Sequence, residues 1–388
     1  MLGRGDRVDV MLAALMNGIT SHTFDFDDTH LKTVIHPSGP VASAILALSE
    51  RKPLNGNDFI HAFILGVEAE CRIGNAVYPE HYDVGWHITG TAGVFGAAAA
   101  AGRLLGLNEQ QMIWAIGLAA AQPVGLREMF GSMTKSFHPG RAAQNGLTAA
   151  LLAQKNFTSS VQGIEAKRGF ANVLSTGFRP GEITDRLGET WEISLNPYKP
   201  FACGIVIHPA IDGCVQLRNE HGIKADDVES VALKVHPLVL ELTGKKTPQA
   251  GLEGKFSVYH SSAVAIIYGA AGEAEYGDAV VRDPKVIALR DKVSASVDQA
   301  MHEDQVHVSI RLKSGKTVEK RVEHAVGSLA RPMSDADLEA KFRGLAAGIL
   351  SDAETGKLME LCWNVGKLKD AGEVARASVP AGKARAAR

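Results

Sequence analysis

Apolar residues recur three or four positions apart along the first half of the chain, which is the spacing of one face of an α-helix. The run VDVMLAALMNGIT at residues 8–20 is typical of this half. The same spacing continues in the segments 39–52, 56–79, 89–107, 108–122 and 140–157. Alanine and glycine fill many of these positions, and small side chains let helix backbones approach closely. The pattern therefore predicts an Ala/Gly-rich helical bundle over residues 8–196.

The pattern changes to alternation after Asn196. Segment 228–237 alternates apolar and polar residues as a half-buried strand does, and segment 291–300 has a weaker form of the same pattern. Residues 305–325 form two alternating runs on either side of KSGK, which predicts a hairpin. A helical segment, 254–271, lies between these strands. The combination predicts an α+β unit with an antiparallel sheet.

Helical spacing returns at Ser334, where Ser334 and Asp337 resemble a capping box. We therefore expect a mainly α protein with an α+β second domain, in which a large all-helical domain is interrupted by a smaller lid domain. The length of 388 residues agrees with two domains. The predicted units are a helical domain at residues 1–196 plus 334–375, a lid at residues 197–333 and a disordered tail at residues 376–388.

Composition and charge argue against several classes of protein. The formal net charge is −2, so there is no general attraction to nucleic acid or to an anionic membrane. The longest uncharged run, 85–102, is rich in Gly and Ala and is more typical of a packed internal helix than of a membrane span. The cysteines form no CxxC pair, and the first residues are charged, unlike a signal peptide. These features predict a cytoplasmic protein with reduced thiols.

Titratable residues are concentrated in one stretch, SHTFDFDDTHLKTVIHPSGP at 21–40. If the preceding helix continued through it, Asp25 and Thr29 would share one helix face. The prolines that follow would then place His36 on a loop. A carboxylate, a hydroxyl and an imidazole could therefore converge at a helix end.

Two other interpretations of this stretch stay open on sequence alone. Asp25, His30 and His36 have the residue types of a two-histidine, one-carboxylate iron site. An EF-hand loop counted from Asp25 fails, because it needs Gly and Glu where the chain has His30 and His36. No HExxH motif occurs in the chain. The remaining interpretation is a solvated polar turn without chemistry.

A second stretch, YDVGWHITGTAG at 82–93, places His87 just before a predicted helix start. We expect a partly exposed imidazole there, because a residue just before a helix start faces its open end, with Thr89 or Thr91 as plausible caps. The positive end of the helix favours the neutral form of such an imidazole. The alternative is a structural histidine beside Trp86.

A third stretch, GSMTKSFHPGRAAQNG at 131–146, brings Lys135, His138 and Arg141 close together. Pro139 and the glycine after it are expected to open a helix. Cations beside the free backbone N–H groups of a helix start favour an anion. The alternative is a group of ordinary surface residues.

A fourth stretch, NPYKPFACGIVIHPAIDG at 196–213, carries Lys199 and His208 across the expected domain boundary. Ligands bind preferentially in clefts between domains, and a buried lysine can act as a base or hold a carboxylate. The chain contains no phosphate loop and no nucleophile elbow. The four stretches together suit a small multi-carboxylate and proton transfer on a carbon next to a carboxylate.

These motifs together resemble the MmgE/PrpD family, which includes 2-methylcitrate dehydratase, cis-aconitate decarboxylase and iminodisuccinate epimerase. The resemblance covers roughly residues 8–365 and rests on HTFDFDDTH, HPSGP, GWHITGTAG, TKSFHPGRAAQNG, KPFACGIVIHPAID and GKFSVYH. It implies a helical domain interrupted by an α+β lid, a homodimer, and a site between the domains that uses no metal or organic cofactor.

The resemblance also implies a set of site residues. The catalytic positions that match the family motifs are Asp25, Thr29, His36, His87, Lys135 and Lys199. The expected substrate-binding positions are Arg141, His138, His208 and Tyr259. We expect the acid and base among the histidines at 36 and 87, with the aspartate at 25 setting the protonation of a neighbour.

The expected function is a cofactor-independent lyase that acts on a small di- or tricarboxylate such as 2-methylcitrate or cis-aconitate. It would be a dehydratase or a decarboxylase that works by proton transfer alpha to a carboxylate. The alternatives are an isomerase or epimerase of an iminodisuccinate-like dicarboxylate, and a non-catalytic carboxylate-binding protein.

The chain departs from the family pattern in two places. The decarboxylase has a histidine a few residues beyond the lid lysine, where this chain has ACGIV at 202–206, and this argues against that activity. Family members also carry several tens of residues before the equivalent of segment 8–20. We therefore expect apolar surface to be exposed near the first helix.

Overall fold

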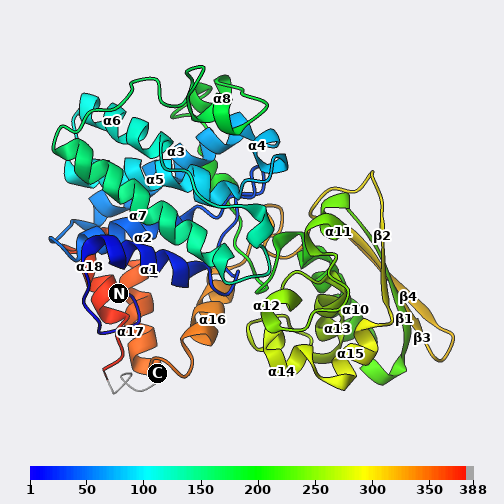
Figure 1. Cartoon of the computed structure of the whole chain (residues 1–388). Helices are drawn as coiled ribbons and strands as arrows, with labels where there is room; N and C mark the ends of the chain where they lie inside the picture. The colour runs from blue at the N-terminus through cyan, green and yellow to red at the C-terminus, as the bar shows by residue number, and fades with distance from the viewer. Residues whose placement is uncertain (382–388) are drawn as a thin grey trace.

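The computed structural model describes residues 1–381, which form two bodies of different character (Figure 1). One body is helical, and the other combines a sheet with the helices that cover it. The helices of the first body, in chain order, are α1 Val10–His22, α2 Ser38–Ser49, α3 Gly56–Val77, α4 Glu80–Asp83, α5 Ile88–Leu105, α6 Glu109–Ala120, α7 Thr134–Gln154, α8 Phe170–Leu174 and α9 Gly181–Thr184. The prediction of a helical first half is thus confirmed.

Small residues set how closely the long helices of this domain pack. A Cβ atom on Gly146 of α7 would lie only 2.5 Å from the Cβ atom of Ala97 on α5. A Cβ atom on Gly18 of α1 would lie 2.4 Å from the Cα atom of Gly140 on α7. Only glycine permits such a backbone contact. Because α1 and α7 touch here, the C-terminal end of α1 lies beside the N-terminal end of α7.

Helix α5 lies at the centre of the bundle, between α3 and α7. Among the described residues it is the one helix with the length and apolar composition that a membrane span requires. In this fold 89% of the span Ile88–Leu105 is buried inside the protein. It is therefore a packed internal helix, as the Gly- and Ala-rich sequence predicts.

The lid is built on a four-stranded sheet of order β2-β1-β3-β4. Its strands are β1 Val228–Val235, β2 Val293–Val297, β3 Val306–Leu312 and β4 Thr317–Val322. Its helices are α10 His208–His221, α11 Pro237–Thr243, α12 Gly251–Gly254, α13 Val258–Tyr268, α14 Asp278–Val281 and α15 Pro284–Arg290. Helices α10 and α13 cover one face of the sheet (Figure 1), so the apolar residues that alternate along β1 are buried on that side.

The sheet is mixed, and the prediction of an antiparallel sheet is wrong for one of its pairs. Strands β1 and β3, and strands β3 and β4, pair antiparallel, but β1 and β2 pair parallel. Parallel neighbours need a long crossover connection. The helices α11 to α15 supply it between β1 and β2.

The chain then returns to the helical domain through α16 Asp335–Ala346, α17 Asp352–Trp363 and α18 Gly372–Ala377. The predicted capping box at Ser334 and Asp337 is present at the start of α16. The prediction of a disordered tail is wrong for residues 376–381, since α18 runs through Ala377 and the Ala381 N–H donates to Glu354 at 2.6 Å. Residues 382–388 lie outside the described part of the chain.

Candidate active site

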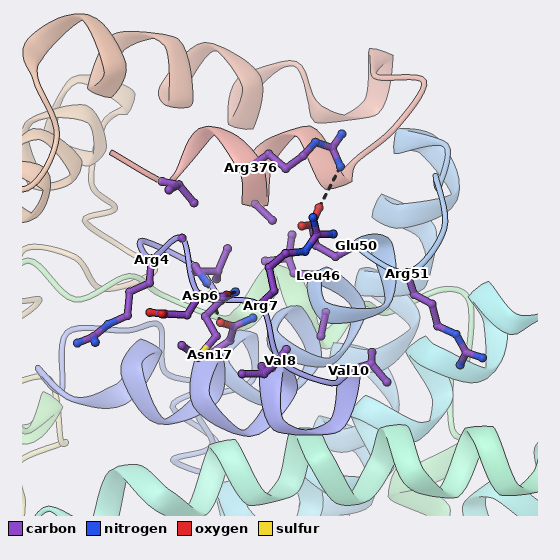
Figure 2. Close-up of a pocket in the computed structure, with 17 residues that line it drawn as sticks. Arg4, Asp6, Arg7, Val8, Val10, Asn17, Leu46, Glu50, Arg51 and Arg376 are labelled. Atoms are coloured by element: carbon purple, nitrogen blue, oxygen red, sulfur yellow. Dashed lines mark hydrogen bonds and ion pairs between the residues drawn. The ribbon is translucent and has the colours of Figure 1, made fainter. Parts of the chain in front are cut away.

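A large cavity lies away from the domain boundary. It has a volume of about 540 Å³ and lies between the N-terminal segment, α1, α2 and α18 (Figure 2). Exposed side chains of Arg4, Arg7 and Arg51 line it. Among the described residues that line it, none is a histidine or a lysine. It therefore offers positive charge but no group suited to proton transfer at neutral pH.

A much smaller cavity of about 50 Å³ lies between the helical domain and the lid. Its charged and hydrogen-bonding lining residues are Asp25, Thr29, His36, His87, Lys135, Lys199 and Thr243. The wall is completed by Val34, Tyr82, Phe130, Gly204, Ile205, Val206, Leu242 and Phe256. The structure thus brings the positions that carry the family resemblance into one cavity. The sequence analysis missed the apolar wall, because in sequence these residues resemble ordinary core.

The loop that follows α1 carries the acidic side of this cavity. Helix α1 ends at His22, and Asp25 has a φ of 51°, in the left-handed region. The expectation that the helix continues and places Asp25 and Thr29 on one face is therefore wrong. The loop instead closes on itself and on the domain boundary, where the Thr29 N–H donates to Pro197 O at 3.1 Å. Both side chains reach the cavity from this loop.

The carboxylate of Asp25 bridges two buried ammonium groups. Its Oδ1 atom accepts hydrogen bonds from Lys135 Nζ at 2.8 Å and from Lys199 Nζ at 3.0 Å. Burial by itself would raise the pKa of Asp25, but the ammonium groups of Lys135 and Lys199 hold it well below its usual range. Burial lowers the pKa of Lys135, and the Asp25 carboxylate opposes that effect. Two cations and one anion thus share a site that is almost closed to water.

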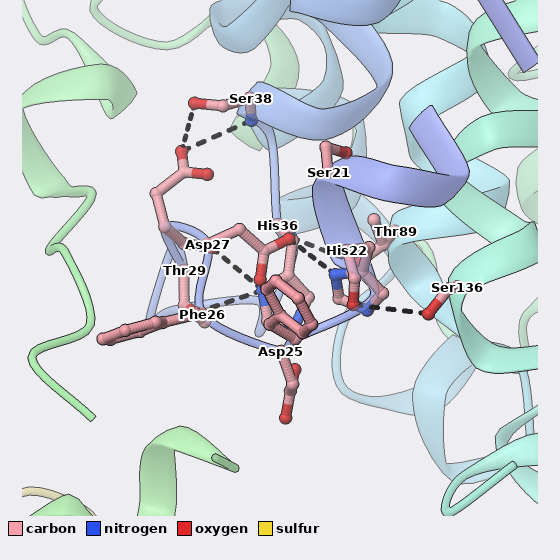
Figure 3. A network of polar contacts seen from close by, with 12 residues as sticks. Ser21, His22, Asp25, Phe26, Asp27, Thr29, His36, Ser38, Thr89 and Ser136 are labelled. Carbon is pink, nitrogen blue, oxygen red and sulfur yellow. Dashed lines mark hydrogen bonds and ion pairs between the residues drawn. The ribbon is translucent and has the colours of Figure 1, made fainter. Parts of the chain in front are cut away.

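His22 and Asp27 belong to the same polar network (Figure 3), and the sequence analysis assigned neither of them to the site. Asp27 Oδ2 lies 2.5 Å from His22 Nδ1, and His22 Nε2 lies 2.7 Å from Lys135 Nζ. Burial lowers the pKa of His22 to about 4, so the ring is neutral at pH 7. A carboxylate accepts the proton on Nδ1, which leaves Nε2 as an acceptor for the Lys135 ammonium. His22, which does not line the cavity, therefore orients Lys135.

His36 is held in one tautomer by its loop (Figure 3). Its Nδ1 atom lies 2.9 Å from the carbonyl of Asp28 and 3.2 Å from the hydroxyl of Thr29. A carbonyl can only accept, so Nδ1 carries the proton and Nε2 carries the lone pair. The described residues offer no hydrogen-bond partner to Nε2, and His36 lines the cavity. This geometry suits a general base.

His87 caps the start of α5, but its side chain is only 1% exposed, so the expectation of a partly exposed histidine is wrong. Its Nδ1 atom lies 2.8 Å from Nδ1 of His138, which packs behind it from α7. Burial lowers the pKa of His87 well below its usual range, and the positive charge of Lys135 adds to this effect. The same two causes lower the pKa of His138 to about 4. His138 does not line the cavity; because one of the two Nδ1 atoms must donate and the other accept, the tautomers of His87 and His138 are coupled.

The iron-site interpretation of Asp25, His30 and His36 is not supported by the geometry. His30 is directed elsewhere, with Nδ1 at 2.7 Å from Thr33 and Nε2 at 2.9 Å from Glu192. A different group, His22, His36 and His87, offers nitrogen atoms within 4.8 Å of one another. The Lys135 ammonium contacts one of these rings, and its charge would repel a bound cation.

None of the four expected substrate-binding residues lines this cavity; His138 packs behind His87, and the other three lie elsewhere. Helix α7 begins at Thr134 rather than at Pro139, so Arg141 lies roughly 240° around the axis from Lys135. Arg141 is exposed and donates to Gln144. The other two, His208 and Tyr259, are also absent from the cavity lining. His208 is buried against Phe201, and Tyr259 is half-buried and packs on the core of the lid.

Comparisons with known proteins agree with this arrangement. Residues 1–183 match the model of the MmgE/PrpD N-terminal domain, and residues 201–365 match that of the MmgE/PrpD C-terminal domain. The chain is 26% identical to a cis-aconitate decarboxylase of Aspergillus terreus over 400 residues, covering 95% of this chain and 81% of the relative. It is 26% identical to that of Homo sapiens over 381 residues, covering 94% and 78%.

A second kind of relative is also similar. A 2-methylcitrate dehydratase of Cupriavidus necator is 24% identical over 318 residues, covering 77% of this chain and 65% of the relative. Both names describe lyases, one that acts by decarboxylation and one by dehydration. The two domain matches together span almost the whole described chain. The chain belongs to the MmgE/PrpD family.

Proposed function

We propose that the protein is a lyase that acts on a small di- or tricarboxylate without a metal or organic cofactor. One observation carries the proposal: Asp25 bridges Lys135 and Lys199 inside a closed cavity that also presents His36 and His87. Buried ion pairs cost desolvation and are weak evidence for stability. Their concentration in a cleft with perturbed pKa values instead marks a functional site.

The chemistry follows from these positions. Lys135 and Lys199 bind a substrate carboxylate, and their charge stabilises the enediolate that forms when the alpha proton leaves. Nε2 of His36 takes that proton. In dehydration, the electron pair of the enediolate expels the beta hydroxyl group, which leaves as water with the proton that His36 took, so His36 returns to its neutral form. Asp25 keeps the two lysines charged and separated until substrate arrives.

We expect substrate to enter between the two domains. Phe130 of the helical domain and Leu242 and Phe256 of the lid line the cavity of about 50 Å³. The same three side chains also line an outer cavity of about 220 Å³. We place the entry path between these two cavities. An ion pair between Arg127 and Glu241, at 2.8 Å, joins the domains beside it.

The apolar wall favours dehydration over decarboxylation. Ile205 and Val206 line the cavity, where the sequence pattern of the decarboxylase would supply a histidine near these positions. Epimerisation is a second candidate, because the ring centroids of His36 and His87 lie 6.4 Å apart in a T-shaped arrangement. Two imidazoles at that distance could remove a proton from one face of a carbon and return it to the other. A cytoplasmic homodimer remains our expectation for the assembly.

A turnover screen tests the proposal. Citrate, 2-methylcitrate, cis-aconitate and iminodisuccinate are supplied in turn, with and without exhaustive chelation, and product is followed by proton NMR. We expect turnover of one of these acids, undiminished by chelator. Loss of turnover with chelator and its recovery with one divalent ion would contradict the cofactor-free mechanism. Carboxylate binding without any turnover would support the non-catalytic alternative.

A further inference from the structure

Three successive backbone carbonyls around Asp25 each accept a hydrogen bond from a different lysine. Lys255 Nζ donates to Phe24 O at 2.9 Å, and Lys199 Nζ donates to Asp25 O at 3.0 Å. Lys341 Nζ donates to Phe26 O at 2.6 Å. A backbone turn that is held by three ammonium groups is far more constrained than its own local hydrogen bonds would make it.

Lys255 and Lys341 lie outside the cavity and connect separate parts of the chain. Lys255, at the end of α12 in the lid, also donates to Ala202 O at 2.9 Å and to Glu273 at 2.8 Å. Lys341, on α16 of the helical domain, also donates to Lys199 O at 2.8 Å. Each lysine therefore joins the turn at Asp25 to the segment that enters the lid. Neither lines the cavity described above.

The conformation of Asp25 explains why such anchoring matters. Its φ of 51° places a non-glycine residue in the left-handed region, which L-amino acids rarely adopt. Surrounding structure must impose this conformation. With it, the carboxylate points between Lys135 and Lys199. A loop free to relax would move the carboxylate away from both ammonium groups.

We propose that Lys341 and Lys255 are positioning residues, which hold the turn at Phe24–Phe26 so that Asp25 stays between the two cavity lysines. The expected effect of these lysines on catalysis rests on the proposed function, whereas their effect on the position of Asp25 does not. Because one anchor comes from the lid and the other from α16, the geometry of Asp25 depends on the closed arrangement of both domains. Domain closure would thus assemble the acidic side of the site as well as exclude water.

Lys341 also has a charge that responds to pH. It faces the carboxylates of Asp27 and Asp28 on the loop, the ammonium of Lys199, and the ring of Phe26 at 4.0 Å. Burial lowers its pKa to about 8, with the two aspartates opposing that effect. Below this pH its hydrogen bonds are charge-assisted, and above it they weaken. An arginine at this position would remain charged throughout.

The experiment compares Lys341→Met, Lys341→Arg, Lys255→Met and the control Lys357→Met, an exposed lysine on α17. We expect Lys341→Met and Lys255→Met to lower kcat by about 10- to 100-fold while KM changes by less than about threefold, since misplacement of a catalytic group acts on the transition state. Lys341→Arg should recover most of kcat. We expect kcat/KM of the parent to fall near pH 8, where Lys341 loses its charge, and this fall should move to higher pH in Lys341→Arg. Lys357→Met should match the parent.

Two measurements keep the inference separate from simple loss of folding and from the choice of substrate. Thermal melts report folding. If Lys341→Met and Lys341→Arg lost the same amount of activity and the same amount of melting temperature, the positioning role would be overturned. A crystal structure of Lys341→Met needs no substrate: we expect Asp25 to leave the left-handed region and its contact with Lys135 to break. An unchanged Asp25 would overturn the inference, whereas absence of turnover in the parent would contradict only the proposed function.

Discussion

Two cavities of this protein differ in whether their charged residues are exposed or buried. The cavity of about 540 Å³ near the N-terminus is lined by arginines with exposed side chains. The cavity of about 50 Å³ between the domains is lined by Lys135, Lys199 and Asp25, which are at most 5% exposed. Solvated charges cost little to maintain, but buried charges carry a desolvation penalty of several kcal/mol each. The smaller cavity is therefore the one whose charges call for a functional explanation.

The contrast extends to hydrogen bonding. Around the smaller cavity almost every ionisable group is fixed by a second group: His22 by Asp27, His87 by His138, and Lys135 by Asp25. At the larger cavity, Arg376 pairs with Glu50, while the described residues give no hydrogen bond to the guanidinium groups of Arg4 or Arg7. Pre-organisation of this kind is what catalysis requires. The following predictions test whether it separates the two cavities in solution.

Asp25→Asn should have the largest effect. We expect kcat to fall by about 10²-fold or more, because the amide cannot keep Lys135 and Lys199 charged and oriented. The free energy of unfolding should also fall by about 3–5 kcal/mol, since two buried ammonium groups lose their shared anion. Steady-state kinetics and urea unfolding measure both quantities. Asp6→Asn, at the larger cavity, is the matched control and should change neither; a similar loss in both variants would remove the distinction.

Lys135→Ala should lower kcat/KM by an amount equivalent to about 2–4 kcal/mol, as expected when a charge-assisted contact to the enediolate is lost. Lys135→Arg should not restore it, because a planar guanidinium cannot occupy the position between His22 and Asp25. Kinetics beside a thermal melt measure the effect. Unchanged kcat/KM in a folded Lys135→Ala variant would exclude Lys135 from the site.

Acidification should destabilise the protein through the buried imidazoles. The pKa values of His22 and His138 are lowered from 6.5 to about 4, so the unfolded chain binds more protons than the folded chain between these pH values. The resulting stability is complete above pH 6.5 and is lost as pH falls toward 4, by about 1.4 kcal/mol per pH unit for each histidine. Urea unfolding at several pH values measures this slope. His138→Gln should flatten it, whereas Arg7→Gln should leave it unchanged.

The smallest effects are expected at the larger cavity itself. Arg7→Gln and Arg51→Gln remove exposed charges, so stability should change by no more than about 0.5 kcal/mol. We expect kcat/KM to stay within about twofold of the parent, because neither residue contacts the network around Asp25. Melts and kinetics of the two variants check this. A large loss of activity in either would show that the two cavities are coupled.

The sequence by itself determined most of the local structure and much of the site. Periodicity located α1, α3, α5 and the β3–β4 hairpin, and Ser334 with Asp337 marked the start of α16, because these features depend on neighbours a few residues away. The family motifs located six polar residues that line the cavity, but not Thr243; the six are Asp25, Thr29, His36, His87, Lys135 and Lys199. A motif is read at fixed positions, so it needs no knowledge of how the chain folds.

Only the tertiary structure decided how these residues meet. The contact of His22 with Lys135 and the anchoring by Lys341 join segments far apart in the chain. The left-handed conformation of Asp25 lies in the turn that these contacts surround. The local sequence pattern also did not predict that β2 pairs parallel with β1, or that the side chain of Arg141 is exposed. Each depends on long-range packing, such as the backbone contact of Gly18 with Gly140. Local propensity cannot encode that packing, because its free energy exists only once both segments are in place.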